Sequence, residues 1–318
     1  MTSDTHFRVR APLPGMARRS TPLPDPLGRG PFAVRAALSS GVSRGRLRNP
    51  SLVTPLRGVR SNALPNSAIE QARAAAAAIR LPFAFSHLTA ARILELPLPD
   101  RWQPAESIHV LRPSTSPVPR IEGVTGRRGL ESRRVYNVAG LTVTTPADTW
   151  ADLGTMLGVD ALVVVGDAVL TRGVALDELA SRVEARAHHR GNAGLRLALQ
   201  LMRPGSGSPM ETRSRLVFHR AGLPEPRLNA DVFADDGGWI LRGDFVWQRQ
   251  RVIAEYQGDV HRIDRKTWQD GFIRRRLAED NGWAMVEFTA RDIFAKTPQR
   301  ELVATLSRLL GSRPRPGA

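Results

Sequence analysis

The last third of the chain switches between helical and strand spacing of its hydrophobic residues. Ser208-Pro-Met-Glu211 opens a helical pattern that carries three adjacent apolar residues and stops at Gly222. Alternating segments then indicate strands, and Asp235-Asp-Gly-Gly238 predicts a hairpin turn. The order is therefore α-β-β-β-α-β-α. The predicted elements are a helix over 208–222, strands over 227–233, 239–247 and 251–256, a helix over 265–281, a strand over 284–288 and a helix over 298–310.

A basic stretch near the N-terminus, residues 28–62, has the pattern of a winged helix-turn-helix. Residues 32–41 have helical apolar spacing and end on a glycine, and 42–48 predict a second short helix with Ser43 as its N-cap. Residues 52–59 predict two short strands around a turn. In this motif the second helix enters the DNA major groove, so its three arginines are candidates to contact phosphates or guanine edges. They are Arg44, Arg46 and Arg48.

The middle of the chain, residues 63–204, predicts helices and strands but no catalytic cluster. His87 lies in an apolar helical pattern, which favours a packed side chain over a ligand. We expect an α+β scaffold or a domain that binds a protein partner. Helical spacing covers 68–79, 83–94, 160–170, 176–186 and 195–201, and strand spacing covers 108–111, 120–124 and 141–144.

Length and charge change this picture in two ways. A chain of 318 residues predicts two or three domains. Its 46 basic and 30 acidic residues give a net charge of +16, and residues 1–62 hold 11 arginines against 2 aspartates, a net charge of +9. Nucleic acid is the commonest partner for such an excess, so we expect DNA as a partner.

The expected fold class is multi-domain α+β. We divide the chain into a disordered basic tail over 1–27, a winged helix over 28–62, the middle domain over 63–204 and a C-terminal domain over 205–312. The absence of cysteine excludes disulfides, thiolate metal sites and cysteine nucleophiles. The longest apolar stretch, near 161–165, is too short to span a bilayer, and no secretory signal is visible. We expect a cytoplasmic protein with no membrane partner.

Two acids in the C-terminal domain are predicted to face each other. If the strands around Arg249-Gln250 pair antiparallel through a two-residue loop, Asp244 lies opposite Glu255 on the same sheet face. Gln257 shares that face. Two carboxylates without a neighbouring lysine suit a hard divalent cation with oxygen ligands, and Mg²⁺ suits if it keeps several waters. Such an ion can support phosphodiester hydrolysis.

This C-terminal pattern resembles the PD-(D/E)xK endonuclease superfamily, in its branch similar to very-short-patch repair endonucleases. The matching pieces are Glu211 in Ser-Pro-Met-Glu, Asp244 in Gly-Asp-Phe, Glu255 in Glu-Tyr-Gln-Gly, His261 in Gly-Asp-Val-His, and the run 270–282. The resemblance implies that the first three acids hold Mg²⁺ or Mn²⁺ and that His261 acts near the scissile phosphate. It also implies that Arg274, Arg275 and Arg276 lie along the substrate backbone.

The sequence departs from that family at Gln257, where the family has a lysine two residues after the acid. Glutamine can orient a water but cannot balance a developing negative charge. The nearby cations available for that task are His261, Arg262 and Lys266.

Each of these residues also has a structural interpretation. Ser208 and Glu211 form a capping box, in which the glutamate serves only the helix. In the alternative, the arginines 274–276 form a solvated helix face and His261 is a turn residue. The acid pair is then no more than charges at a strand edge. Trp268, Phe272 and Trp283 are expected in the core.

Two functions remain in view. The N-terminal pattern around Gly41-Val-Ser-Arg-Gly-Arg-Leu47 resembles the winged-helix domain of abortive-infection type antitoxins, and its alternative is a basic helix pair that packs on the rest. One function is a DNA endonuclease delivered by a winged helix. The other is a non-catalytic DNA-binding regulator with a degenerate nuclease fold.

Overall fold

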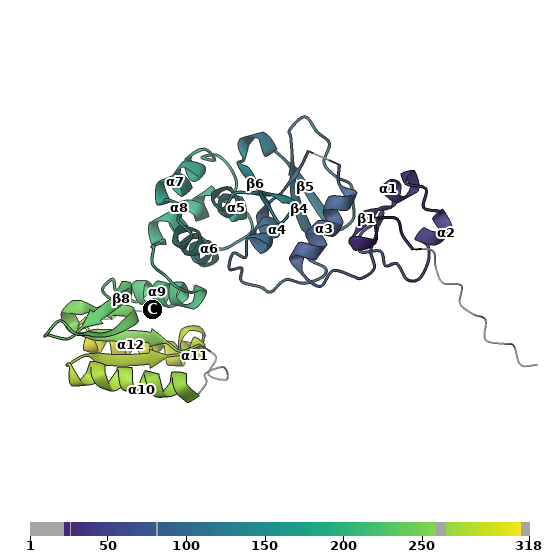
Figure 1. Cartoon of the computed structure of the whole chain (residues 1–318). Helices are drawn as coiled ribbons and strands as arrows, with labels where there is room; N and C mark the ends of the chain where they lie inside the picture. Colours follow the sequence, from purple (N-terminus) through teal and green to yellow (C-terminus); the bar gives the residue numbers. More distant parts are fainter. Residues whose placement is uncertain (1–21, 26, 81, 259–264, 313–318) are drawn as a thin grey trace, which may run out of the picture. The chain divides into compact units, whose positions relative to one another are not determined.

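The computed structural model describes residues 22–25, 27–80, 82–258 and 265–312, without the side chains of 265–270. The chain divides into two compact units, Met1–Arg80 and Leu81–Ala318. Helices and three sheets in the described residues confirm the expected multi-domain α+β class (Figure 1). Most of the predicted tail over 1–27 lies outside the described residues, and its end begins the short 3-10 helix η1 (Leu27–Arg29).

The first unit holds short elements around a small core. Ser43 caps the second helix, because its side chain accepts the backbone N–H of Arg46 at 3.2 Å, as predicted. The helix predicted from Phe32 begins only at Val34, since the two residues before it pair with β2. The elements are β1 (Phe32–Ala33), α1 (Val34–Ser39), α2 (Arg44–Leu47), β2 (Val59–Arg60) and α3 (Ala68–Ala78).

The predicted hairpin over 52–59 is displaced towards the C-terminus. Val53 forms a single bridge with Ser61, and the second strand is Val59–Arg60, which pairs with β1. The boundary of the unit also moves, from residue 62 to Arg80. The reason is α3, whose alanine face contacts β1 and β2 and is buried in this unit.

A five-stranded mixed sheet with the order β5-β4-β3-β7-β6 begins the second unit. The helix predicted over 83–94 was wrong at its start: Ala84–Phe85 is a buried strand and the helix begins at His87, because a short apolar run suits either element. The strand predicted over 120–124 lies at Val124–Arg128 instead, and β6 was not predicted. The elements are β3 (Ala84–Phe85), α4 (His87–Ile93), β4 (Ile108–Arg112), β5 (Val124–Arg128), β6 (Val135–Val138) and β7 (Leu141–Thr144).

Four helices follow this sheet. The three that were predicted are present, and α5, which carries the fully buried Trp150, was missed. The indole N–H of Trp150 donates to the carbonyl of Leu162 at 2.8 Å, which fixes α5 to α6. The helices are α5 (Pro146–Leu153), α6 (Val159–Thr171), α7 (Leu176–Glu184) and α8 (Asn192–Leu201).

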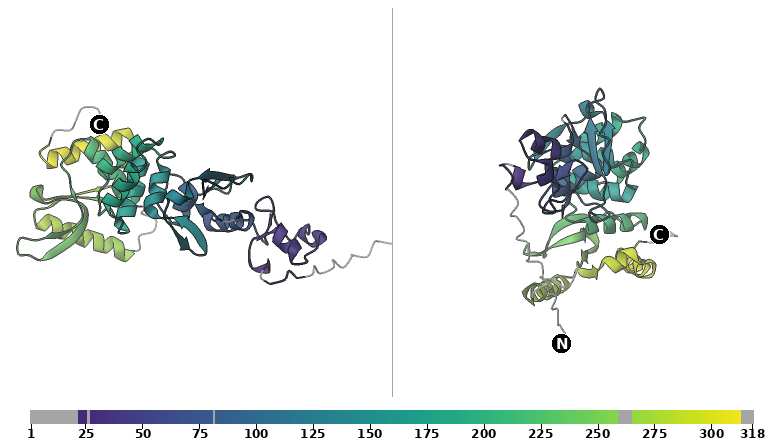
Figure 2. Two further views of the ribbon diagram at one scale, coloured as in Figure 1. Left: turned by 90° about the horizontal axis from the view of Figure 1, so that it is seen from above. Right: turned by 90° about the vertical axis from the view of Figure 1, so that its right-hand side faces the viewer.

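The rest of the unit is a four-stranded sheet, β11-β10-β9-β8, with helices on both faces. Its element order matches the predicted α-β-β-β-α-β-α, with one added short helix, α11. Figure 2 shows α10 and α12 on opposite sides of this sheet. The elements are α9 (Pro209–Arg220), β8 (Arg227–Phe233), β9 (Trp239–Trp247), β10 (Val252–Tyr256), α10 (Arg265–Asp280), β11 (Ala284–Phe288), α11 (Ala290–Phe294) and α12 (Lys296–Leu309).

The two faces of this sheet bury different side chains. Phe245 and Trp247 of β9 pack with Phe218 of α9, whereas Val246 packs in the cluster that contains Ala278 of α10 and Trp283. Trp283 is in the core as expected, but the expectation for Phe272 was wrong, because its side chain is 64% exposed. The side chain of Trp268 lies outside the described residues.

A buried ion pair joins α6 to α9. Arg215 Nη2 lies 2.8 Å from Asp167 Oδ2, and the two side chains are 3% and 1% exposed. Asp167 also accepts the hydroxyl of Thr212 at 3.0 Å and the backbone N–H of Arg203 at 2.8 Å. The stretch 204–208 is held by this network, since the hydroxyls of Ser206 and Thr212 lie within hydrogen-bond distance of each other at 2.9 Å.

Candidate active site

The β9–β10 register brings the predicted acid pair to one face. Trp247 pairs with Val252, Val246 with Ile253 and Phe245 with Ala254, which is the register expected from the sequence. The connection is four residues long rather than two, because Gln248–Gln250 form a 3-10 turn (η3) and Arg251 adopts a left-handed φ of 51°.

Asp244 and Glu255 therefore share the face covered by α10. Side chains two residues apart on a strand lie on the same face, so Asp244 shares a face with Val246, and Glu255 shares a face with Ile253. Both of these apolar neighbours pack in the cluster that includes Ala278 of α10. The acids thus lie at the end of an apolar surface, where water is partly excluded.

A third acid, Glu287, lies beside this pair and was not predicted as a site residue. β10 and β11 are parallel, and their register places Glu255 opposite Glu287. Asp244, Glu255 and Glu287 thus form an acidic row across three adjacent strands. The sequence around Glu287 does not show which residue it pairs with, because β11, which carries it, is separated from its parallel partner β10 by the whole of α10.

Burial alters the acid–base behaviour of the pair. Removal from water raises the pKa of Asp244 to about 6, the backbone N–H of Tyr256 lowers it, and the charge of Glu211 raises it. That N–H donates to Asp244 Oδ2 at 2.9 Å. Burial raises the pKa of Glu255 to about 7, where the charge of Arg274 lowers it and the charges of Asp244 and Glu287 raise it. Both carboxyls therefore bind protons more tightly in the folded chain than they would in water.

The three predicted arginines of α10 have different surroundings. Arg274 is close enough to Asp244 and Glu255 to favour the charged form of both, and it lowers the pKa of each. Arg275 forms an ion pair with Glu287. The side chain of Arg276 is 82% exposed and reaches only Asp280, at 3.9 Å. Arg274 and Arg276 are both exposed, which fits the alternative of a solvated face, whereas Arg275 is half-buried.

Glu211 acts mainly at the start of α9. Its Oε2 accepts the backbone N–H of Gly207 at 2.7 Å and the side-chain amide of Asn229 at 2.5 Å. Ser208 accepts the backbone N–H of Glu211 at 3.2 Å, which is the capping interpretation. Within the described part of the chain, no three ligating side chains form a group that could hold a metal ion, so Glu211 does not complete a set with Asp244 and Glu255.

The remaining predicted residues of this site are only partly placed. Gln257 directly follows β10, and its backbone N–H donates to the carbonyl of Phe288 at 2.7 Å, which continues the ladder with β11. His261 and Arg262 lie outside the described residues, as does the side chain of Lys266. Of the cations near the acid pair, the structure places Arg274 and Arg275, and the charge of Arg274 acts on both acids.

Two carboxylates can still hold a divalent cation. Mg²⁺ keeps several waters and commonly takes only one or two carboxylates from a protein. Asp244 and Glu255 are such oxygen donors, they lie side by side at a half-buried and a buried position, and burial raises the pKa of both. These features fit the ion that the family resemblance implies, with these two residues as its ligands.

The predicted nucleic-acid contacts of the first unit lie on α2. Arg44 and Arg48 are exposed. Arg46 is half-buried, and its guanidinium donates to the hydroxyl of Ser51 at 3.3 Å. Two of the three side chains are thus available to a backbone phosphate, although α2 is only one turn long.

Comparisons with known proteins give relatives but no described function. Two proteins of Mycobacterium tuberculosis, from strains CDC 1551 / Oshkosh and ATCC 25618 / H37Rv, are each 30% identical to this chain over 209 residues. The match covers 64% of this chain and 74% of each relative, and both are named as uncharacterized proteins. The chain belongs to their family. No family model matches it, and no solved structure does.

One structural property bears on membranes. None of the helices in the described residues is long and apolar enough to cross a bilayer.

The raised pKa values predict how stability depends on pH in the metal-free protein. Both carboxyls bind protons more tightly in the folded chain than at their ordinary pKa values of 3.8 and 4.5. The free energy of unfolding should therefore fall as pH rises from about 5 to about 8, by on the order of a few kcal/mol. Urea unfolding in the presence of a chelator measures this fall.

The double variant Asp244→Asn, Glu255→Gln should show a much smaller decrease over the same pH range. Glu122→Gln, which changes an exposed acid, is the matched control and should behave like the wild type. An equal decrease in the wild type and the double variant would show that other groups cause the pH dependence.

Proposed function

We propose that this protein is a metal-dependent DNA endonuclease whose active site is the Asp244–Glu255 pair under α10. The observation that carries the proposal is the half-buried Asp244 beside the buried Glu255, both with raised pKa values, on one face of β9 and β10. Buried acids are costly unless a partner compensates their charge. A divalent cation is such a partner, and the family resemblance at these positions points to phosphodiester hydrolysis.

Asp244 and Glu255 would hold the ion, which when bound supplies an activated water and stabilises the leaving oxygen. The backbone N–H of Tyr256 fixes the orientation of the Asp244 carboxylate, since it donates to Oδ2 at 2.9 Å. Arg275 forms an ion pair with Glu287, and its charge lowers the pKa of Glu255 less than the charge of Arg274 does.

Arg274 supplies the positive charge that a lysine provides in the PD-(D/E)xK endonuclease pattern. Its charge already acts on both acids, whereas Gln257 is neutral. A guanidinium near the scissile phosphate stabilises negative charge that grows in the transition state. The basic α2 of the first unit would bring the chain to DNA through phosphate contacts.

Cleavage of a plasmid in Mg²⁺ or Mn²⁺, with and without chelator, tests the site. Asp244→Asn and Glu255→Gln should each abolish metal-dependent cleavage, because each removes a charged oxygen ligand. Arg274→Ala should slow cleavage roughly 100-fold, the typical cost of losing one group that stabilises a developing anion. Arg276→Ala is the matched control on the same helix and should cleave at the wild-type rate.

Full cleavage by both acid variants would end the nuclease-site proposal. If the wild type cleaves with neither metal, and Gln257→Lys does not restore cleavage, the alternative of a non-catalytic DNA-binding regulator becomes the better account. If the wild type cleaves, and Gln257→Lys cleaves at the same rate or faster, the result supports the endonuclease proposal.

Salt dependence tests the DNA-binding role of α2. Each phosphate contact that is lost should lower the slope of log affinity against log salt by roughly 0.9. Replacing Arg44 and Arg48 by Ala should therefore flatten the slope for duplex binding, whereas Arg300→Ala, an exposed arginine of α12, should leave it unchanged. An unchanged slope in the double variant would move the phosphate contacts to another surface.

A further inference from the structure

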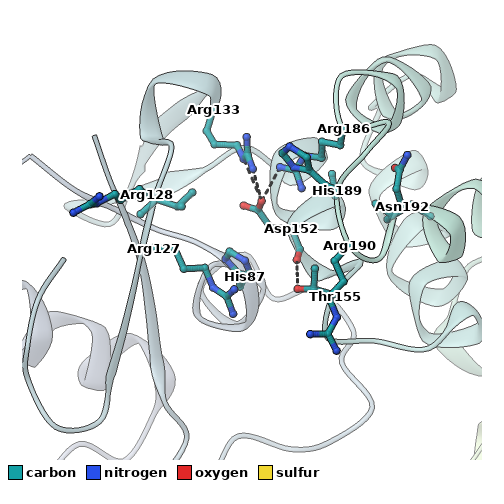
Figure 3. Close-up of a pocket in the computed structure, with 13 residues that line it drawn as sticks. His87, Arg127, Arg128, Arg133, Asp152, Thr155, Arg186, His189, Arg190 and Asn192 are labelled. Atoms are coloured by element: carbon teal, nitrogen blue, oxygen red, sulfur yellow. Dashed lines mark hydrogen bonds and ion pairs between the residues drawn. The ribbon is translucent and has the colours of Figure 1, made fainter. Parts of the chain in front are cut away.

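The second unit contains a cavity of ≈ 130 Å³ lined by arginine, which we call the arginine pocket. It lies in the part of the chain that the sequence analysis assigned only as a scaffold. Figure 3 shows the guanidinium groups of Arg133 and Arg186 on the buried Asp152, whereas the side chain of Arg128 points away from this acid. The charged residues of the pocket are Arg127, Arg128, Arg133, Arg186, Arg190 and Asp152.

Asp152 neutralises part of this charge. Its Oδ1 accepts from Arg133 Nε at 3.1 Å and Nη2 at 3.0 Å, and from Arg186 Nη2 at 2.6 Å. The three side chains form a rigid base, because Asp152 is 2% and Arg186 is 7% exposed. One carboxylate between two guanidinium groups leaves this base with an excess of one positive charge.

The other three arginines add charge without compensation. Arg127 and Arg128 end β5, and Arg190 precedes α8; all three are exposed. Among the described residues, their side chains make no hydrogen bond or ion pair. Five arginines against one aspartate give the pocket a net charge of +4.

The backbone around the pocket is built for close packing. Gly191 has a φ of +86°, and a Cβ there would lie 2.2 Å from the carbonyl oxygen of Gly154. Only glycine permits this approach, which holds Arg190 and the buried Asn192 against the end of α5. His87 completes the wall with a left-handed φ of 50° and a ring stacked on His109, with centroids 5.6 Å apart.

The two histidines add polar groups but no charge near neutral pH. Burial lowers the pKa of His87 to about 4, and it lowers the pKa of His109 to about 4 as well. Each ring is therefore neutral at pH 7 and can donate one hydrogen bond. The pocket combines a neutral donor with an excess of guanidinium, which suits an anion rather than a cation.

We propose that the arginine pocket binds a phosphomonoester dianion, the terminal phosphate of a nucleotide or of a nucleic-acid strand. The guanidinium groups of Arg127 and Arg190, whose side chains have no partner among the described residues, match the acceptor oxygens of such an anion, because guanidinium forks bind phosphate with paired hydrogen bonds. A dianion also offsets the net charge of +4 better than a carboxylate does. The proposal does not depend on Asp244 or Glu255, which lie on the other sheet of the unit.

Calorimetric titration of the full chain with inorganic phosphate, at constant ionic strength, tests this site. The wild type should bind phosphate, and the double variant Arg127→Ala, Arg190→Ala should bind at least about 10-fold more weakly, because each lost charge-assisted hydrogen bond costs about that factor. Arg300→Ala, an exposed arginine outside the pocket, is the matched control and should bind like the wild type. Asp244→Asn should also bind like the wild type, so that failure of the nuclease proposal stays distinguishable.

Two further probes separate the sources of the phosphate. Tighter binding of an oligonucleotide with a 5′-phosphate than of the same strand with a 5′-hydroxyl would support a strand end. Binding of a nucleoside monophosphate but of neither oligonucleotide would support a free nucleotide. Equal phosphate affinity in the wild type and the double variant, or no binding of any probe, would overturn the proposal; should the alanine variant unfold, Gln at both positions gives the same comparison.

Discussion

The buried ion pair between Asp167 and Arg215 is the contact on which the arrangement of the second unit depends. Both side chains are almost fully removed from water, so losing one partner would leave an uncompensated charge at a cost of about 3–5 kcal/mol. The pair fixes α9 to α6 one turn after Glu211. That glutamate in turn holds Gly207 and Asn229, and its charge raises the pKa of Asp244. A helix-packing contact thus influences the electrostatics of the candidate active site.

The same balance of buried charge appears at two places with opposite sign. Under α10, burial raises the pKa values of Asp244 and Glu255, and the charge of Arg274 offsets this rise only in part. In the arginine pocket, Asp152 offsets only one of five positive charges. Each place favours a ligand of the missing sign: at the acids because Glu255 is buried, and in the pocket because its exposed arginines find no acid partner among the described residues. A cation fits the first and a phosphate the second.

The local pattern of apolar residues predicted the strands that carry the acid pair. It failed for features that depend on contacts between residues far apart in the sequence. The alternation over β9 and β10 contains the register that places Asp244 beside Glu255. The role of Glu287 could not be predicted, because its pairing with Glu255 joins strands on either side of α10. Burial of Ala84–Phe85 turned an apparent helix start into a strand, and the arginine pocket assembles residues 87 to 190, which no local motif connects.

The central claim is that Asp244 and Glu255 hold a divalent cation, and calorimetric titration of Mn²⁺ into the metal-free protein tests it most directly. With pKa values of about 6 and about 7, the two carboxyls should release protons when the ion binds near pH 6, and release far fewer near pH 8.5. Titrations in two buffers of different ionisation enthalpy count those protons. The account predicts binding and proton release in the wild type, and loss of both in Asp244→Asn and Glu255→Gln. Binding of equal strength in these variants would contradict it.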